Sequence, residues 1–436
     1  MKWKSSLFSW ILPKLKLKLS RYFFIITLVL YSGSLSYAAD DLYNAFKEGK
    51  FNGTFKLLAY ERDFDLEGKI DYKDIAIGGH MQYETAPLYG FSGGFGFKTA
   101  QGSQWHDEDY GVYPYMFATG ATSKDAENFT ALNQYYIRYS GYDTEITVGA
   151  QYVNTPLLAG KDIRLTPISY RGYTLVNKSI PKVELRAMYI TDYMHYAFDS
   201  YEPISTGLRG AAKNSDEGVL VGGVIWSPIK GLRAQLWGYN FRDAFNSIYL
   251  RGSYQTKPWT DTVRGNGSKG FGYSIDAQYM KQDDSGDAIA GKIDTDQMGI
   301  RLGASAYGFY LQGIFGTVGD QTLKGIKYAA NFSQMQVQAL TAAERDVYGL
   351  KLGYNFGQIG AEGLSAYAWH SKFDSPDSGI NSATDFTETD FNLQYKLKGA
   401  LKNFTVRLRH AIIDYDDYGS KNQDYTDSRL YIIYRF

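Results

Sequence analysis

Cysteine is absent from this chain of 436 residues, which excludes disulfide bonds and thiolate metal sites. Histidine is scarce, with five residues, and proline occurs only ten times. Tyrosine and glycine are abundant by contrast, with 39 and 46 residues. Many tyrosines and glycines with few prolines favour a fold of many regular strands over helices or disorder.

Long hydrophobic runs are also missing after the N-terminal region, and the mean hydropathy is −0.34. A bundle of membrane-spanning helices is therefore excluded. A membrane β-barrel stays open, because only alternate residues of each strand face lipid and the mean hydropathy resembles that of a soluble protein.

The N-terminal region has the layout of a secretory signal peptide. A basic stretch leads into the apolar run Tyr22 to Leu30, followed by small residues and the sequence Ser36-Tyr37-Ala38. A membrane anchor is the alternative, but this run is much shorter than the ~20 residues that a spanning helix needs. We expect a signal peptide at residues 1–38 and one exported domain at residues 39–436.

Charge gives no reason to expect nucleic acid as a partner. The formal net charge of the whole chain is zero, with 46 basic and 46 acidic residues. Six of the basic residues and none of the acidic ones lie in the first 39 positions, so the exported domain is mildly acidic.

The exported domain repeats one pattern, in which an alternating stretch of about ten residues precedes a polar connection. Apolar rows that often begin or end with Tyr or Phe alternate with rows of Gly, Ser, Gln, Tyr and Arg. Clear examples are Gly53 to Asp63, Glu145 to Tyr152, Leu232 to Leu236, Ile300 to Ala306 and Phe391 to Leu397. The long connections expected between them include Asn246 to Lys269 and Val318 to Arg345. This pattern predicts an all-β fold, an antiparallel transmembrane barrel with aromatic girdles. Chain length favours about 18 strands, with 16 as the alternative.

The final residues, RLYIIYRF from Arg429 to Phe436, form one more amphipathic strand. A closing strand with a C-terminal aromatic residue resembles the signal read by the bacterial outer-membrane assembly machinery. We therefore expect the bacterial outer membrane as the location, outer-membrane lipid as a partner, and the assembly machinery as a partner through Phe436. Monomer and homotrimer both stay open.

Several segments together resemble the OprD-like family of substrate-specific outer-membrane porins. They are TFKLLAYERDF (Thr54 to Phe64), EITVGAQYVNTPLLAGKDIRLTPISYRG (Glu145 to Gly172), LKNFTVRLRHAI (Leu401 to Ile412) and the closing RLYIIYRF. The resemblance implies an 18-stranded barrel whose third extracellular loop folds inward and narrows the pore. It also implies a ladder of arginines on the wall that guides carboxylate-bearing solutes.

Carried over residue by residue, the resemblance places Arg407, Arg409 and Arg429 on the ladder. It places Arg164 at the narrowest point of the inward loop, with Asp162 as a facing acid and Arg171 in the same constriction. One position departs from the family, which usually has Gly before the loop arginine, where this chain has Ile163.

Alternation independently predicts which way the arginines face. If Arg407 and Arg409 faced lipid near the bilayer midplane, each would cost ~2–4 kcal/mol, so the lumen is the expected side. The same argument applies to arginines on other polar rows. Those further candidates for the lumen are Arg62, Arg138, Arg186, Arg233 and Arg301.

We expect a porin for passive diffusion of small hydrophilic solutes, favouring carboxylate-bearing ones such as amino acids or short peptides. No cofactor and no metal site are expected. An enzymatic barrel would need His near Asp or Ser, and none of the five histidines stands in a catalytic context. A surface adhesin or structural barrel is the remaining alternative, although it would need neither an arginine-lined lumen nor an inward loop.

Overall fold

The computed structural model describes residues 39–113, 115–119, 126–160, 163–208, 217–256, 271–325, 331–416 and 423–436. The predicted signal peptide at residues 1–38 and the predicted constriction residue Asp162 lie outside these ranges. Among the described residues, no helix is both long and apolar enough to cross a membrane.

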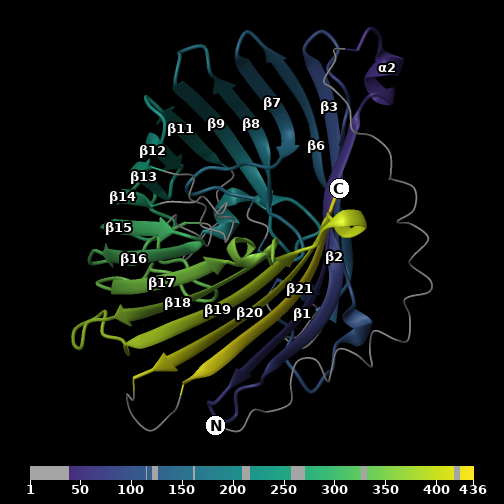
Figure 1. Ribbon diagram of the computed structural model, residues 1–436. Coiled ribbons are helices and arrows are strands. Elements are labelled where there is room, and N and C mark those ends of the chain that lie inside the picture. Colours follow the sequence, from purple (N-terminus) through teal and green to yellow (C-terminus); the bar gives the residue numbers. More distant parts are fainter. Residues whose placement is uncertain are drawn as a thin grey trace.

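Eighteen antiparallel strands follow one another around a closed barrel, which confirms the predicted fold class (Figure 1). They are β1 (Lys50–Phe64), β2 (Tyr72–Glu84), β3 (Phe91–Gln101), β6 (Phe129–Gly141), β7 (Thr144–Gln151), β8 (Ser169–Asn177), β9 (Val183–Met194), β11 (Val219–Trp226), β12 (Leu232–Phe241), β13 (Phe245–Gln255), β14 (Gly272–Asp284), β15 (Asp294–Ala306), β16 (Phe309–Val318), β17 (Asp346–Asn355), β18 (Leu364–Asp374), β19 (Phe386–Lys396), β20 (Phe404–Tyr415) and β21 (Tyr425–Arg435).

Short elements accompany the barrel. The helix α2 (Leu42–Lys47) precedes β1, and the two-residue strands β4 (Ala118–Thr119), β5 (Ala126–Glu127) and β10 (Glu202–Pro203) lie in connections. Single 3-10 turns occupy Ser103–Trp105, Ile204–Gly207, Phe356–Ile359 and Gly399–Leu401.

The barrel closes where the first strand pairs with the last. Strand β1 is antiparallel to β21, with partners running from Thr54 opposite Arg435 to Phe64 opposite Tyr425. The other edge of β1 pairs with β2. Closure of this kind leaves no open sheet edge, which a strand crossing a bilayer could not tolerate because its backbone groups would have no partner.

The two ends of the barrel differ in their connections. One end, called here the turn end, carries mainly short turns together with the start of β1 and the end of β21. The other, the loop end, carries long connections such as residues 102–128, 195–218 and 319–345. One of the two-residue turns is Tyr142-Asp143 between β6 and β7, where φ is positive at both residues (51° and 55°). Two consecutive positive φ values make the hairpin turn whose twist matches that of the flanking strands.

One predicted connection is wrong. Residues Asn246 to Lys269 were expected to form a long loop, whereas Phe245–Gln255 forms the regular strand β13. The connection begins only at residue 256 and lies at the turn end. In β13, Ile248 and Leu250 alternate with polar residues such as Arg251. These inward-facing polar residues made the segment resemble a polar connection in the sequence.

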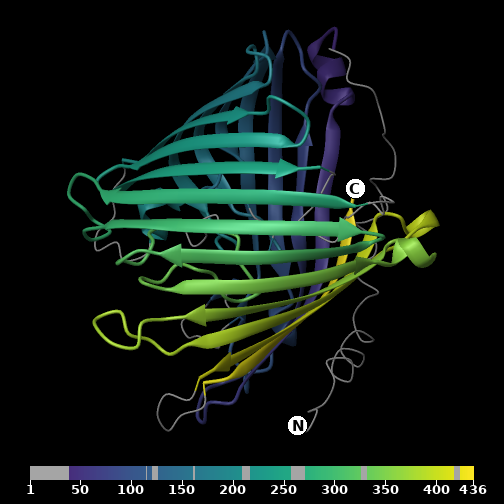
Figure 2. The same cartoon turned by 60° about the vertical axis from the view of Figure 1, so that its left-hand side comes forward.

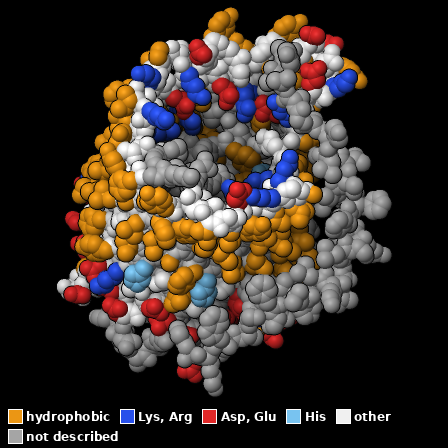
Figure 3. Space-filling view, in the orientation of Figure 1, with side chains coloured by type: hydrophobic (Ala, Val, Ile, Leu, Met, Phe, Trp, Pro, Cys, Tyr) orange, Lys and Arg blue, Asp and Glu red, His pale blue; other side chains and the backbone are white. Residues whose placement is uncertain are grey.

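Outward rows of the barrel are apolar, as alternation predicted. Large side chains such as Ile137, Leu250, Leu302 and Leu350 are 43–64% exposed, although each lies in the middle of a strand. Exposing such a surface to water would be unfavourable in free energy, whereas lipid solvates apolar side chains well. The long strands of the wall lie side by side in Figure 2, and in Figure 3 hydrophobic side chains form a broad belt on the outer wall below the opening of the barrel.

Candidate functional site

The candidate site is the lumen, and a segment of the connection between β7 and β8 crosses it. At one side of the lumen the backbone N–H of Leu157 donates to the hydroxyl of Tyr239 on β12, at 3.3 Å. At the other side, Nζ of Lys56 on β1 donates to the carbonyl of Arg164 at 2.6 Å. The hydroxyl of Tyr431 on β21 donates to the carbonyl of Ile163 at 3.4 Å. The inward loop implied by the family resemblance is therefore present.

Arg164 lies in this inward segment beside an aromatic stack. Its guanidinium carbon is 4.7 Å from the ring centre of Tyr113, and the Tyr113 ring stacks on Tyr60 of β1 with centroids 3.4 Å apart. The guanidinium carbon of Arg429 is 5.7 Å from both rings. Segments far apart in sequence thus meet around Arg164.

A second inward segment, residues 331–340 between β16 and β17, was missed by the sequence analysis. The carboxylate of Glu388 accepts the backbone N–H groups of Val337 and Gln338, both at 2.8 Å, and the carboxylate of Asp390 accepts that of Gln336 at 2.9 Å. The region was expected only as a polar connection. Its apolar residues Phe332, Met335, Val337 and Leu340 are buried or half-buried, and they were the signal that could have revealed a packed loop.

The three predicted ladder arginines lie on β20 and β21 and face the lumen, but in different environments. Nε of Arg407 donates to the amide oxygen of Asn392 at 2.6 Å, so its hydrogen-bond partner is neutral. Nη2 of Arg409 is 3.8 Å from the carboxylate of Asp390, which is a long ion pair.

Arg429 departs from the ladder expectation, because it does not reach open lumen. The residue is only 2% exposed, and its guanidinium bonds both oxygens of Asp427 at 2.6 and 3.1 Å and the carbonyl of Gln336 at 3.3 Å. The second inward segment covers it. A guanidinium buried and paired in this way holds neighbouring elements together.

Arg171 also departs from its predicted place. It lies on β8, outside the inward segment, and pairs with Asp192 of β9 at 2.8 Å. Its guanidinium reaches the hydroxyl of Tyr135, at 3.4 Å, and Tyr135 belongs to an outward row. The family resemblance carried Arg171 over with the loop motif, whereas the chain has already re-entered the barrel wall at Ser169, where β8 begins. A register shift follows between Arg171 and Gly172.

The other candidate arginines lie where alternation placed them. Arg62 on β1 bonds Asp427, and Arg138 on β6 bonds Glu84 on β2, at 2.6 and 2.9 Å. Arg186, Arg233 and Arg301 line a large cavity at the turn end of the lumen. Figure 3 shows Lys and Arg side chains gathered around an opening of the barrel, with fewer acidic ones among them.

Basic residues that the sequence analysis did not single out also shape the lumen. Lys56 anchors the first inward segment, Lys98 on β3 donates to the carbonyls of His195 and Tyr196, and Arg251 on β13 lines the turn-end cavity. Alternation could have found Lys56 and Lys98, since each stands on a polar row. Arg251 was missed because its strand had been taken for a loop.

A closed 18-stranded barrel with an apolar outer belt, a charged lumen and loops folded into it defines an outer-membrane channel. A family model described as "outer membrane porin, OprD family" matches residues 93–436. The chain belongs to the OprD family of bacterial outer-membrane porins, as the sequence resemblance predicted.

Solved structures agree on the fold. The structure of Pseudomonas aeruginosa OccK9 (OpdG) is similar, with a TM-score of 0.80 and 18% sequence identity. The structure of P. aeruginosa OpdK with vanillate is also similar, with a TM-score of 0.76 and 19% sequence identity. Acinetobacter baumannii OccAB2 is similar with 0.76 at 18%. In each comparison 90% of this chain and 99% of the other are covered. No curated protein matches the sequence.

Proposed function

We propose that this porin admits small hydrophilic solutes by passive diffusion and favours those bearing a carboxylate, such as amino acids or short peptides. The observation that carries the proposal is the environment of Arg407 and Arg409. Arg407 has the neutral amide of Asn392 as its partner, and Arg409 lies 3.8 Å from the carboxylate of Asp390. Both guanidinium groups therefore still attract an incoming anion.

Arg164 is proposed as the basic group of the constriction. It lies on the inward segment next to Tyr113, and its backbone is held by Lys56. Arg429 takes a supporting role, in which it fixes Asp427 and the second inward segment. Of the solved structures, that of OpdK contains vanillate, an aromatic carboxylate, which fits this substrate class.

The described residues give no support to the alternative of a surface adhesin. Such a barrel would need neither arginines on the lumen wall nor a loop folded inward, and both features are present.

The test is reversal potential across a planar bilayer in a salt gradient. The pure mature protein is compared with the double variant Arg407→Ala/Arg409→Ala and with Lys402→Ala, which removes an exposed cation from the turn between β19 and β20. We expect an anion-selective parent, an unchanged control and a double variant shifted toward cations. An unshifted double variant would remove the ladder from the proposal, and folded protein without conductance would overturn the channel function itself.

A further inference from the structure

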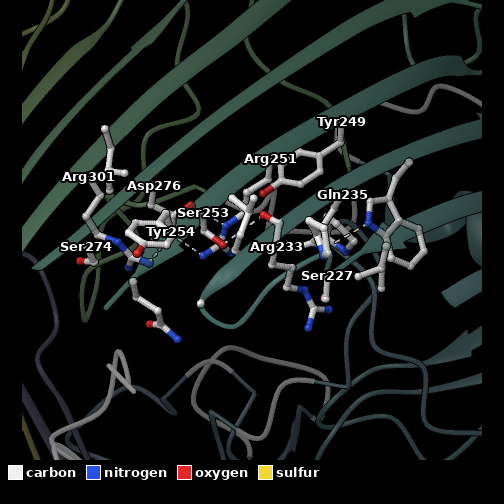
Figure 4. A pocket seen from close by; sticks show the side chains of 18 of the residues that line it. Ser227, Arg233, Gln235, Tyr249, Arg251, Ser253, Tyr254, Ser274, Asp276 and Arg301 are labelled. Atoms are coloured by element: carbon white, nitrogen blue, oxygen red, sulfur yellow. Dashed lines mark hydrogen bonds and ion pairs between the residues drawn. The ribbon is translucent and has the colours of Figure 1, made fainter. Parts of the chain in front are cut away.

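A cavity of about 1120 Å³ opens into the lumen near the turn end, and it lies on the wall opposite the arginine ladder. Strands β12, β13 and β14 form its wall, and Asn154, Pro156 and Ala159 of the first inward segment border it (Figure 4). Counted around the barrel, β13 is the tenth strand, whereas Arg407 and Arg429 stand on the seventeenth and eighteenth. The ladder and this cavity are therefore separate surfaces.

The cavity is strongly basic. One acidic residue, Asp276, lines it, against six basic residues. These are Lys182, Arg186, Lys230, Arg233, Arg251 and Arg301. A further carboxylate, that of Glu184, bonds Arg186 at 2.5 Å. Six cationic groups facing two carboxylates leave an excess of four positive charges, in a space that the barrel wall partly shields from bulk water.

The deep part of the cavity holds two arginines on one shared carboxylate. Asp276 accepts Arg251 through both of its oxygens, at 2.9 and 2.5 Å, and also accepts Nη2 of Arg301 at 2.8 Å. Phe332 of the second inward segment packs on both guanidinium groups, 5.2 and 4.7 Å from its ring centre. One carboxylate is thus shared by two guanidinium groups and holds both of them in a fixed orientation.

The mouth of the cavity carries cations of a different kind. Lys182, Lys230 and Arg233 are exposed, and within the described ranges none of them has an ion-pair partner. In Figure 4 the Arg233 side chain extends away from the Arg251–Asp276–Arg301 group into open space. The cavity thus has two basic positions, one deep and oriented and one at the mouth. Ser253, Ser274 and Gln235 provide neutral hydrogen-bonding groups along its wall.

We propose that this turn-end cavity is a binding site for small organic dianions, which carry either two carboxylates or a phosphate ester. One anionic end contacts Arg251 and Arg301, while the other charge is neutralised by Arg233 and Lys230 at the mouth. A monocarboxylate can satisfy one position only and leaves the other cations unneutralised. The inference rests on the proposed channel function and adds a second solute site beyond the ladder.

The test measures binding and conduction on the same protein. Isothermal titration in detergent at pH 7.5 compares succinate, propionate and glycerol phosphate on the parent, on Arg233→Gln/Lys230→Gln and on the charge control Lys402→Gln. Both substituted residues of the double variant are exposed, so its folding should be unaffected. We expect succinate or glycerol phosphate to bind the parent about tenfold more tightly than propionate, and the double variant to lose about tenfold in affinity for the dianion only.

The outcomes separate the two proposals. Equal affinity for succinate, glycerol phosphate and propionate, or a double variant that binds dianions like the parent, overturns the second site. If the affinity for glycerol phosphate depends on Arg233 and Lys230 and the affinity for succinate does not, the site is specific for phosphate esters. Reversal potentials on the same preparations then report on the channel: an anion-selective parent with no dianion preference leaves the proposed function standing and removes only the second site.

Discussion

Nη2 of Arg62 lies 2.6 Å from the carboxylate of Asp427, and this ion pair joins the first strand of the barrel to the last. The two residues are direct partners in the β1–β21 register. Asp427 also accepts the Tyr60 hydroxyl at 2.8 Å and the guanidinium of Arg429 at 2.6 Å. Gln336 of the second inward segment donates to the same carboxylate at 2.8 Å, so one buried acid connects the closing seam and that segment.

Replacing Asp427 with Asn should destabilise the barrel strongly. The substitution leaves Arg62 and Arg429 without their carboxylate, and breaking a buried pair on one side typically costs about 3–5 kcal/mol. Thermal unfolding in detergent, followed by circular dichroism, should show a lower midpoint. The matched control is Glu362→Gln, which removes the exposed partner of Lys398 and should leave the midpoint unchanged. Equal midpoints for both variants would show that the seam does not depend on this carboxylate.

Loss of the Glu388 carboxylate should release the second inward segment. Both oxygens of Glu388 accept backbone N–H groups of that segment, and the amide of Gln has only one acceptor, so Glu388→Gln leaves one N–H facing another donor. We expect larger single-channel conductance and faster proteolysis within residues 331–340. Gln338→Ala is the control, since it removes only a side-chain bond to Tyr425 and retains both backbone contacts. Unchanged conductance in Glu388→Gln would mean that the segment does not narrow the pore.

Lys56→Met should loosen the first inward segment. Nζ of Lys56 makes a charge-assisted hydrogen bond to the Arg164 carbonyl, and such bonds are about twice as strong as neutral ones. The expected result is noisier open-channel current, measured in single-channel recordings. Tyr431→Phe removes only the longer contact to Ile163 and should be nearly silent. Quiet current in Lys56→Met would show that other contacts suffice to hold Arg164.

His195 should make the loop end sensitive to acid. Burial, together with the nearby charges of Lys98 and Arg164, lowers the pKa of His195 to about 3. Its ring lies 4.4 Å from Tyr115 and 4.6 Å from Tyr196, and neither ring nitrogen has a hydrogen-bond partner among the described residues. The unfolded chain binds a proton near pH 6.5 while the folded chain stays neutral, so stability falls as the pH drops from about 6.5 toward 3.

Replacing His195 with Phe should remove this part of the acid sensitivity. The free energy of unfolding of the variant, measured relative to that of the parent, should be about 2 kcal/mol higher at pH 5 than at pH 7.5. Unfolding midpoints of both proteins at pH 7.5, 6 and 5 would measure it. Parallel pH curves for the two proteins would contradict a neutral buried His195.

Alternation predicted the orientation of most wall arginines correctly. Arg62, Arg186, Arg233 and Arg301 all face the lumen, because lipid on the other side makes the reverse register costly. Two positions were not predicted correctly. Arg171, which the family resemblance placed in the constriction, lies in the wall strand β8 beside a register shift, and Arg251 was missed because the alternating strand β13 had been taken for a loop.

The sequence by itself determined the closed antiparallel barrel, its outer-membrane location and the family, since a period of two is a local property that lipid enforces along every strand. Only the tertiary structure decided which basic groups remain available to a solute. Arg429 is buried and bonded to Asp427 beneath Gln336, whereas Arg233 faces an open cavity, and both residues stand on equivalent polar rows. That difference depends on strand register and on where the inward segments pack, and these are contacts between residues far apart in the chain.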